Sequence, residues 1–191
     1  MKKGLLTIGI GGGGINIISN LSTRKLLDLD FLAIDTDLQT LEPCLAQEKI
    51  LLGERGLGFN SVKDNFDAIL DEIKPNLTEK ISGYKKVVVV LCLGGNTSAK
   101  VAPFVLKLLN ERSIQTFVIC TFPFSCEQNK KKALAQNCLT EINKLNKDIY
   151  CLRNDDLLDL NSHYTLLQMF GFQNEEIARK INAFILQDAR C

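Results

Sequence analysis

Short apolar runs alternate with amphipathic stretches along the chain. The runs are rich in β-branched residues and predict strands at residues 5–10, 31–34, 49–52, 87–91, 114–120 and 149–152. Between them, apolar positions recur at helical spacing, most clearly at Val62, Phe66, Ile69, Leu70 and Ile73. Ser61 stands where it could cap that helix. The alternation of strand and helix predicts an α/β fold, a doubly wound parallel sheet with helices on both faces.

Two segments add detail to this fold. The run at residues 87–91, VVVVL, has no polar alternation, so we expect a strand that is buried on both faces. Residues 164–189 predict a long final helix, because the apolar residues of this segment fall mostly at helical spacing. A chain of 191 residues is about the size of one large domain, so we expect a single domain over residues 1–191 whose part 161–191 includes that helix.

Composition excludes several classes of protein. The formal net charge is +1 with acids and bases interspersed, so no basic stripe indicates a nucleic-acid partner. The seven cysteines include no Cys-x-x-Cys pair, which argues against a metal site and favours reduced thiols. The longest apolar run, residues 87–93, is far shorter than the ~20 residues of a membrane span. We therefore expect a cytoplasmic protein without a membrane span or a metal site of its own.

A glycine-rich loop follows the first predicted strand. Residues 9–16, GIGGGGIN, lead from a strand into a helix, which lets backbone N–H groups approach a phosphate at the positive helix end. Gly9, Gly11 and Gly14 also satisfy the dinucleotide fingerprint Gly-x-Gly-x-x-Gly, and Asp35 or Asp37 follows where a ribose-binding acid would stand. A tight strand-to-helix turn with no ligand is the simplest alternative.

A second loop of the same kind distinguishes these interpretations. Residues 92–100, CLGGNTSAK, again lead from a strand through glycines into a helix. Two helix N-termini that converge on one ligand suit a diphosphate or triphosphate, because each supplies unpaired N–H donors and partial positive charge. A dinucleotide oxidoreductase that uses NAD leaves the second loop unexplained and remains a distant alternative.

Taken together, the motifs closely resemble those of FtsZ, the tubulin-like cell-division GTPase of bacteria. The resemblance runs in order along essentially the whole chain and is carried by residues 8–16 (IGIGGGGIN), 31–41 (FLAIDTDLQTL), 55–58 (RGLG), 121–127 (TFPFSCE), 153–158 (RNDDLL) and 170–174 (FGFQN). It implies a Rossmann-like tubulin/FtsZ GTPase domain that ends in a long central helix and binds GTP or GDP, with Mg²⁺ accompanying GTP.

The resemblance also implies roles for individual residues. Those implied to hold phosphates are Gly11, Gly12, Gly13, Gly94, Gly95, Asn96, Thr97, Ser98 and Lys100. Those implied to hold the ribose are Glu127 and Lys131, and those implied to hold guanine are Asn16, Asn154, Phe170 and Asn174. A carboxylate accepts bonds from ribose hydroxyls, asparagine offers a donor and an acceptor, and an aromatic ring can stack on a base. For Lys100, a solvated lysine in the first helical turn is an equal alternative.

Three departures from the family pattern bear on hydrolysis. The second loop reads GGNTSAK where the family has GGGTGTG, and the segment after Gly58 is shortened. The family's catalytic loop, with its Asn-x-Asp pattern, and its second domain would follow the last helix, whereas this sequence ends at Cys191. We assign no catalytic residue and expect guanine-nucleotide binding with little or no hydrolysis. If the chain is cut from a longer protein, the alternative is ordinary FtsZ-like polymerisation and hydrolysis.

These departures lead to a hypothesis about partners. We expect the chain to modulate or cap a tubulin-like filament by binding full-length FtsZ or another copy of itself, head to tail or through the last helix. The alternative is a pseudo-GTPase that acts as a nucleotide-independent scaffold or dimer. The apolar residues of the last helix would then form the association surface.

Overall fold

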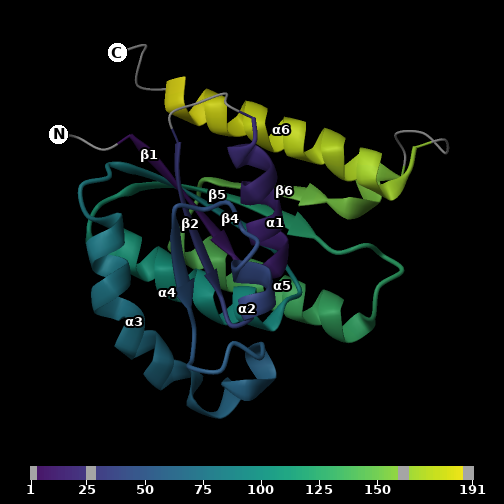
Figure 1. The fold of residues 1–191 in the computed structure, drawn as a ribbon. Coiled ribbons are helices and arrows are strands. Elements are labelled where there is room, and N and C mark those ends of the chain that lie inside the picture. Colours follow the sequence, from purple (N-terminus) through teal and green to yellow (C-terminus); the bar gives the residue numbers. More distant parts are fainter. Residues whose placement is uncertain (1–3, 25–28, 159–163, 187–191) are drawn as a thin grey trace.

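A six-stranded parallel sheet forms the centre of the computed structural model, which describes residues 4–24, 29–158 and 164–186 (Figure 1). The strands are β1 (Leu5–Ile10), β2 (Leu29–Asp35), β3 (Glu48–Leu51), β4 (Lys86–Cys92), β5 (Gln115–Phe122) and β6 (Ile149–Arg153). Their order across the sheet is β3-β2-β1-β4-β5-β6, and all neighbouring pairs are parallel. Each strand overlaps one that the hydrophobic pattern predicts, so that prediction is confirmed.

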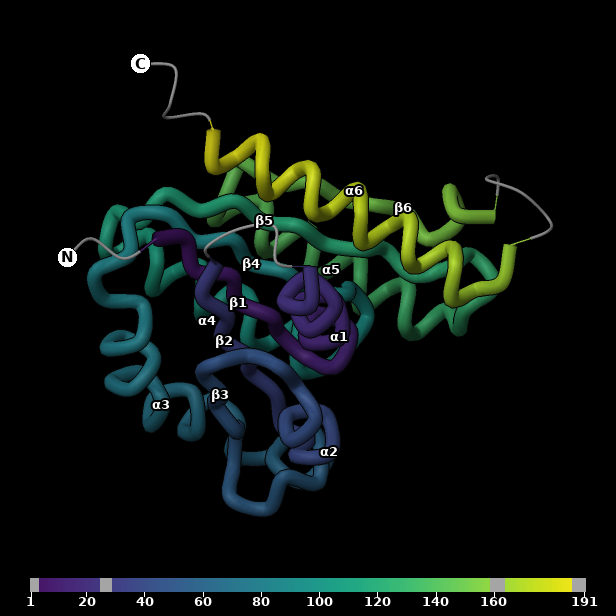
Figure 2. The backbone as a smooth tube through the Cα atoms, turned by 45° about the horizontal axis from the view of Figure 1, so that its top comes forward, coloured from purple at the N-terminus to yellow at the C-terminus, as the bar shows by residue number. Residues whose placement is uncertain are grey.

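Helices cover both faces of this sheet. They are α1 (Gly11–Ser22), α2 (Leu38–Leu41), α3 (Phe66–Ile81), α4 (Asn96–Glu111), α5 (Asn129–Leu145) and α6 (Leu166–Leu186). Buried side chains of α1 and α6 pack on one face, and those of α3, α4 and α5 pack on the other. Figure 2 shows α6 running beside α1 along one side of the molecule, across the sheet from α4. The predicted doubly wound fold with a long final helix is confirmed.

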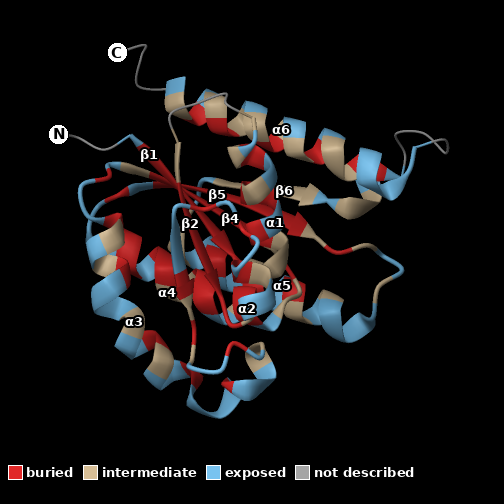
Figure 3. Cartoon of the chain, viewed as in Figure 1, coloured by how far each residue is buried: buried red, intermediate tan, exposed pale blue. Residues whose placement is uncertain are grey.

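Strand β4 lies between the two helical layers. Val87 and Val89 pack into the cluster on the side of α3, α4 and α5, and Val88 and Val90 pack into the cluster on the side of α1 and α6. All four side chains have 0% exposure, and Figure 3 shows the buried centre of the sheet with exposed residues confined to the outer surfaces. The expected burial on both faces is therefore confirmed.

The start of α3 differs from the sequence prediction. Two short 3-10 turns, Phe59–Ser61 and Lys63–Asn65, precede it, so α3 begins at Phe66 and Ser61 is not its cap. The Ser61 hydroxyl instead donates to the carbonyl oxygen of Gly58 at 2.7 Å, which closes the first tight turn. Val62 and Phe66 are both buried, so the hydrophobic spacing reflects a shared core and not one continuous helix.

The topology creates a crevice between β1 and β4, which are direct neighbours. After β1 the chain enters α1 on one face, and after β4 it enters α4 on the opposite face. Ligands of open parallel sheets bind outside the carboxyl ends of the strands at such a switch point. Within the three described ranges, none of the helices combines the length and apolar character that a membrane span requires.

Candidate functional site

Two helix N-termini meet at the switch point. Helix α1 starts at Gly11 after Ile10, and α4 starts at Asn96 after Gly95. Neither cap residue makes a side-chain capping bond, and neither helix has an acidic residue in its first turn. Their first backbone N–H groups are thus available, and partial positive charge gathers at this edge. This is the geometry that a phosphate group requires.

Glycine is needed in the first loop for two reasons. Gly11 has φ of 70°, and a Cβ there would lie 2.7 Å from the hydroxyl oxygen of Ser98. A Cβ on Gly13 would lie 2.4 Å from the sulfur of Cys92. The backbone of the loop therefore packs directly against β4 and α4, which places its N–H groups beside those of the second loop.

Buried hydroxyl groups join the loops that surround this edge. Ser98 Oγ donates to the carbonyl oxygen of Ile10 at 3.2 Å, and the hydroxyls of Thr36 and Thr97 are 3.0 Å apart and hydrogen-bonded. Asp35 accepts from the backbone N–H of Thr36 at 2.7 Å. Ser98 and Thr97 are buried, so these two side chains hold the loops together, and their contact with a phosphate would come through the backbone.

A cavity of about 590 Å³ extends from the two glycine loops along α1 to the start of α6. This volume is in the range of small-molecule sites. The predicted residues that line it are Gly13, Asn16, Glu127, Lys131, Asn154, Phe170 and Asn174. The remaining predicted residues, which belong to the two helix N-termini and do not line it, are Gly11, Gly12, Gly94, Gly95, Asn96, Thr97, Ser98 and Lys100. Of these, Asn96 and Lys100 are exposed.

An ion pair stands at the middle of the cavity wall. Lys131 Nζ bonds Glu127 Oε2, and the other carboxylate oxygen accepts from the backbone N–H of Phe124 at 2.9 Å. Desolvation raises the pKa of Glu127, but the bonds from Lys131 and Phe124 outweigh it and leave the pKa below its ordinary value. The group is therefore an ionised hydrogen-bond acceptor at neutral pH. Its partner Lys131 packs against Gly94 of the second glycine loop.

Aromatic rings and side-chain amides line the far end. The rings of Phe124 and Phe170 meet edge to face with centroids 6.5 Å apart. Asn154, directly after β6, accepts a hydrogen bond from Gln173 of α6 at 3.2 Å between Nε2 and Oδ1. A planar ring can stack on an aromatic face here, while the amides supply donors and acceptors to its edge.

Several lining residues were not among the predicted site residues. They are Ile17, Asn20, Cys92, Leu93, Thr121, Pro123, Phe124, Leu167 and Gln173. Helical spacing could have indicated the helical ones, because Asn20 lies one turn beyond Asn16, and Leu167 and Gln173 lie one turn from Phe170. Burial raises the pKa of the Cys92 thiol, so this lining cysteine is a neutral group.

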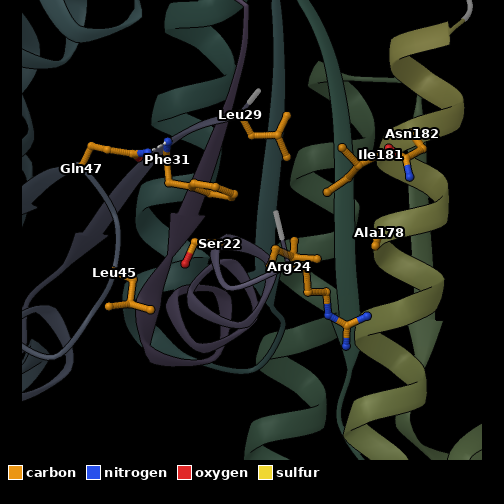
Figure 4. Close-up of a pocket in the computed structure, with 10 residues that line it drawn as sticks. Ser22, Arg24, Leu29, Phe31, Leu45, Gln47, Ala178, Ile181 and Asn182 are labelled. Atoms are coloured by element: carbon orange, nitrogen blue, oxygen red, sulfur yellow. Dashed lines mark hydrogen bonds between the residues drawn. The ribbon is translucent and has the colours of Figure 1, made fainter. Parts of the chain in front are cut away.

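A second cavity, of about 320 Å³, lies near the amino end of β2, at the opposite end of the strands from the glycine loops (Figure 4). Its walls come from the end of α1, the start of β2 and the middle of α6. In it, Gln47 accepts a hydrogen bond from the backbone N–H of Phe31 at 2.7 Å. None of the predicted residues lines this cavity, and the carboxyl ends of the strands do not open into it. The candidate site is therefore the cavity at the glycine loops.

Comparison with known proteins finds matches along most of this chain. Residues 4–162 match the family model for the Tubulin/FtsZ family, GTPase domain. The cell division protein FtsZ 1 of Archaeoglobus fulgidus is 29% identical over 184 residues, which are 95% of this chain and 50% of that protein. FtsZ of Methanothermobacter thermautotrophicus is 27% identical over 93% of this chain and 47% of its own length. The chain thus spans about half the length of the curated relatives that it matches.

Solved structures share the fold. An empty FtsZ dimer of M. jannaschii superposes with a TM-score of 0.83 at 23% identity, over 97% of this chain and 55% of that chain. CetZ2 of Haloferax volcanii, solved as a protofilament with bound GTPgS, superposes with a TM-score of 0.80 at 20% identity, over 95% of this chain and 58% of that chain.

Proposed function

This chain belongs to the Tubulin/FtsZ family through its GTPase domain, and from that membership we propose that its cavity binds a guanine nucleotide, GTP or GDP. One observation carries the proposal. A single cavity lies against Gly13 in the first turn of uncapped α1 and against Cys92 and Leu93 just before uncapped α4, and it has a wall with an ionised carboxylate and an end lined by amides and aromatic rings. Phosphates, ribose and base each require one of these three chemistries, in this order along the ligand.

Each part of the nucleotide has candidate partners. The first-turn N–H groups of α1 and α4 hold the phosphates, with Mg²⁺ accompanying GTP. The carboxylate of Glu127 accepts from the ribose hydroxyls, and Lys131 keeps that carboxylate ionised. Asn16, Asn154 and Asn174 read the edge of guanine and Phe170 packs on its face.

Calorimetric titration of the nucleotide-stripped protein tests this proposal. We expect GTP and GDP to bind with micromolar dissociation constants and ATP and NAD to bind at least about tenfold more weakly, because amide groups discriminate between base edges. Asn174→Ala removes one such amide and weakens guanine binding, whereas Asn143→Ala, on the exposed side of α5, leaves it unchanged. Preferred binding of NAD would instead support an oxidoreductase, and binding of no nucleotide would support a pseudo-GTPase.

We further propose that the 191-residue chain by itself hydrolyses GTP slowly. Among the described residues that line the cavity, Glu127 is the single carboxylate, and its ion pair with Lys131 makes it a poor base for water. The buried hydroxyls of Thr97 and Ser98 are already bonded to Thr36 and Ile10. Release of inorganic phosphate during the GTP titration is the measurement, and multiple turnovers per minute would contradict slow hydrolysis.

The partner forms a separate part of the proposal. Relatives have been solved as a dimer and as a protofilament, and we propose that this chain binds a full-length family member and modulates or ends its filament. Sedimentation of full-length FtsZ with GTP tests this, since equimolar chain is expected to reduce the pelleted fraction. An unchanged pellet would argue against a filament role.

A nucleotide-independent scaffold is the second candidate, favoured by exposed apolar side chains at the start of α6. Leu166 and Leu167 are 53% and 83% exposed, and Phe172 is 41% exposed. Exposed apolar groups that cluster in this way mark association surfaces. Light scattering distinguishes the two candidates, because a dimer without nucleotide supports the scaffold and a monomer supports filament modulation.

A further inference from the structure

Gln173 is a buried polar residue in the wall of the cavity. It lies on α6 with 5% of its surface exposed, between the predicted base-binding residues Phe170 and Asn174. Burial of a primary amide is unfavourable unless its polar atoms find partners. The Nε2 group of Gln173 has such a partner in Oδ1 of Asn154, at 3.2 Å.

This bond determines how Asn154 is presented to a ligand. An asparagine amide has one acceptor end and one donor end, and rotation about its last bond exchanges them. When Gln173 donates to Oδ1, the oxygen points toward α6 and the Nδ2 group is the end available to the cavity. Helix α6, which carries this donor, is long and is packed on the sheet through buried Ile177 and Phe184.

We propose that Gln173 sets the base selectivity of the site by holding Asn154 with its donor end toward the base. The inference rests on the proposed guanine-nucleotide binding and adds to it a residue that orients a base-contacting amide. A purine with an acceptor such as a 6-keto oxygen at this position is favoured, and a purine with a 6-amino group presents donor against donor and is disfavoured. Asn16 and Asn174 line the same cavity and remain available for the other positions of the base.

Replacement of Gln173 by glutamate is the direct test. A glutamate carboxylate cannot donate to Oδ1 of Asn154, so Asn154 turns, donates Nδ2 to the carboxylate and presents its oxygen to the base. The probes are GDP and the 5′-diphosphate of 2,6-diaminopurine riboside, in which an amino group replaces the 6-keto oxygen. We expect Gln173→Glu to shift the ratio of the two dissociation constants by about tenfold toward the amino compound.

A second variant leaves the buried glutamine in place. In Asn154→Asp one carboxylate oxygen still accepts from Gln173 and the other faces the base, so the same shift of the ratio is expected. In the Asn154→Ala background, Gln173→Glu is expected to leave the ratio unchanged, because Gln173 acts through Asn154. A purely structural role of Gln173 would lower the affinities for both compounds equally and would overturn the inference.

The two levels of the proposal fail separately. If the unmodified protein binds neither compound, the proposed function is wrong and so is the inference that rests on it. If the unmodified protein binds GDP and both Gln173→Glu and Asn154→Asp keep its preference for GDP, the function stands and the inference is wrong.

Discussion

The carboxylate of Asp155 accepts a hydrogen bond from the backbone N–H of Ser125 at 2.8 Å. This bond joins the segment after β5, which carries Glu127, to the segment after β6, which carries Asn154. The hydrogen bond from Ser125 is also the main reason why the pKa of Asp155 lies below its ordinary value. Asp155 therefore remains ionised at neutral pH and holds the two cavity walls together.

Asp155→Ala is expected to weaken guanine-nucleotide binding by about fivefold, because the Ser125 N–H loses its acceptor and the two segments move apart. Calorimetry measures the effect. Asp156→Ala is the matched control, since the neighbouring Asp156 is exposed and its carboxylate does not bond Ser125. Equal affinities of the two variants would show that the bond does not hold the cavity together.

The contribution of Glu127 to nucleotide affinity is expected to stay constant around neutral pH and to fall in acid, below the ordinary pKa of a glutamate. The pKa of Glu127 is lowered overall, since the bonds from Lys131 and Phe124 outweigh desolvation. The Glu127 carboxylate accepts hydrogen bonds from the ribose only while it is ionised. Its contribution to nucleotide affinity is therefore lost as the pH falls through the lowered pKa. Binding measured across this range checks the profile, and Glu127→Gln should remove the acidic decline. A decline that persists in Glu127→Gln would assign it to another group.

Gly13→Ala is expected to destabilise the fold by about 1–3 kcal/mol, because its methyl group would overlap Cys92. Thermal unfolding without nucleotide measures the cost. Gly12→Ala is the matched control on the same helix, because its Cβ would stand 3.7 Å from Thr40, an ordinary contact distance. If both variants unfold at the same temperature, the close packing of α1 on β4 is not a constraint.

The bond between Thr36 and Thr97 is expected to show a coupling energy of about 1 kcal/mol in a double-mutant cycle with valine at each position. The two hydroxyls are 3.0 Å apart and buried, so removal of either one breaks this bond, while Asp35 Oδ1 still accepts from the Thr36 hydroxyl at 3.4 Å when Thr97 is replaced. Chemical denaturation of the four proteins of the cycle supplies the energies. If the changes in the free energy of unfolding of the two single variants add up to that of the double variant, the loops after β2 and β4 are not coupled through this bond.

Phe184→Ala is expected to destabilise the protein by about 3–5 kcal/mol, which would establish α6 as part of the core. The Phe184 side chain is 2% exposed and stacks against Phe117 of β5 with ring centroids 5.3 Å apart. Leu186→Ala on the same helix serves as the control, since Leu186 is 56% exposed and its loss should change stability by less than about 0.5 kcal/mol. Similar unfolding transitions for both variants would contradict the observed docking.

Sequence reasoning located each strand of the described residues because each contains adjacent apolar residues, and the run is longest in β4, which is buried between two helical layers. It also found both glycine loops from their place between a strand and a helix, while the resemblance to FtsZ supplied Asn16, Phe170 and Asn174, which line the cavity. The start of α3 was missed because Val62 belongs to the same core as Phe66 without belonging to the same helix. Spacing along the chain therefore predicts which side chains share a layer but not where every helix begins.

By itself, the sequence determined the strands, their alternation with helices and the residue chemistry at the ends of the strands. Only the tertiary structure decided that β1 lies beside β4, that Thr36 meets Thr97 and that Gln173 holds Asn154. Periodicity is a local property, set by the repeat of a helix or a strand within a few residues. Contacts between distant segments depend on the strand order and on the packing of all helices at once, and the orientation of the Asn154 amide is a consequence of that packing.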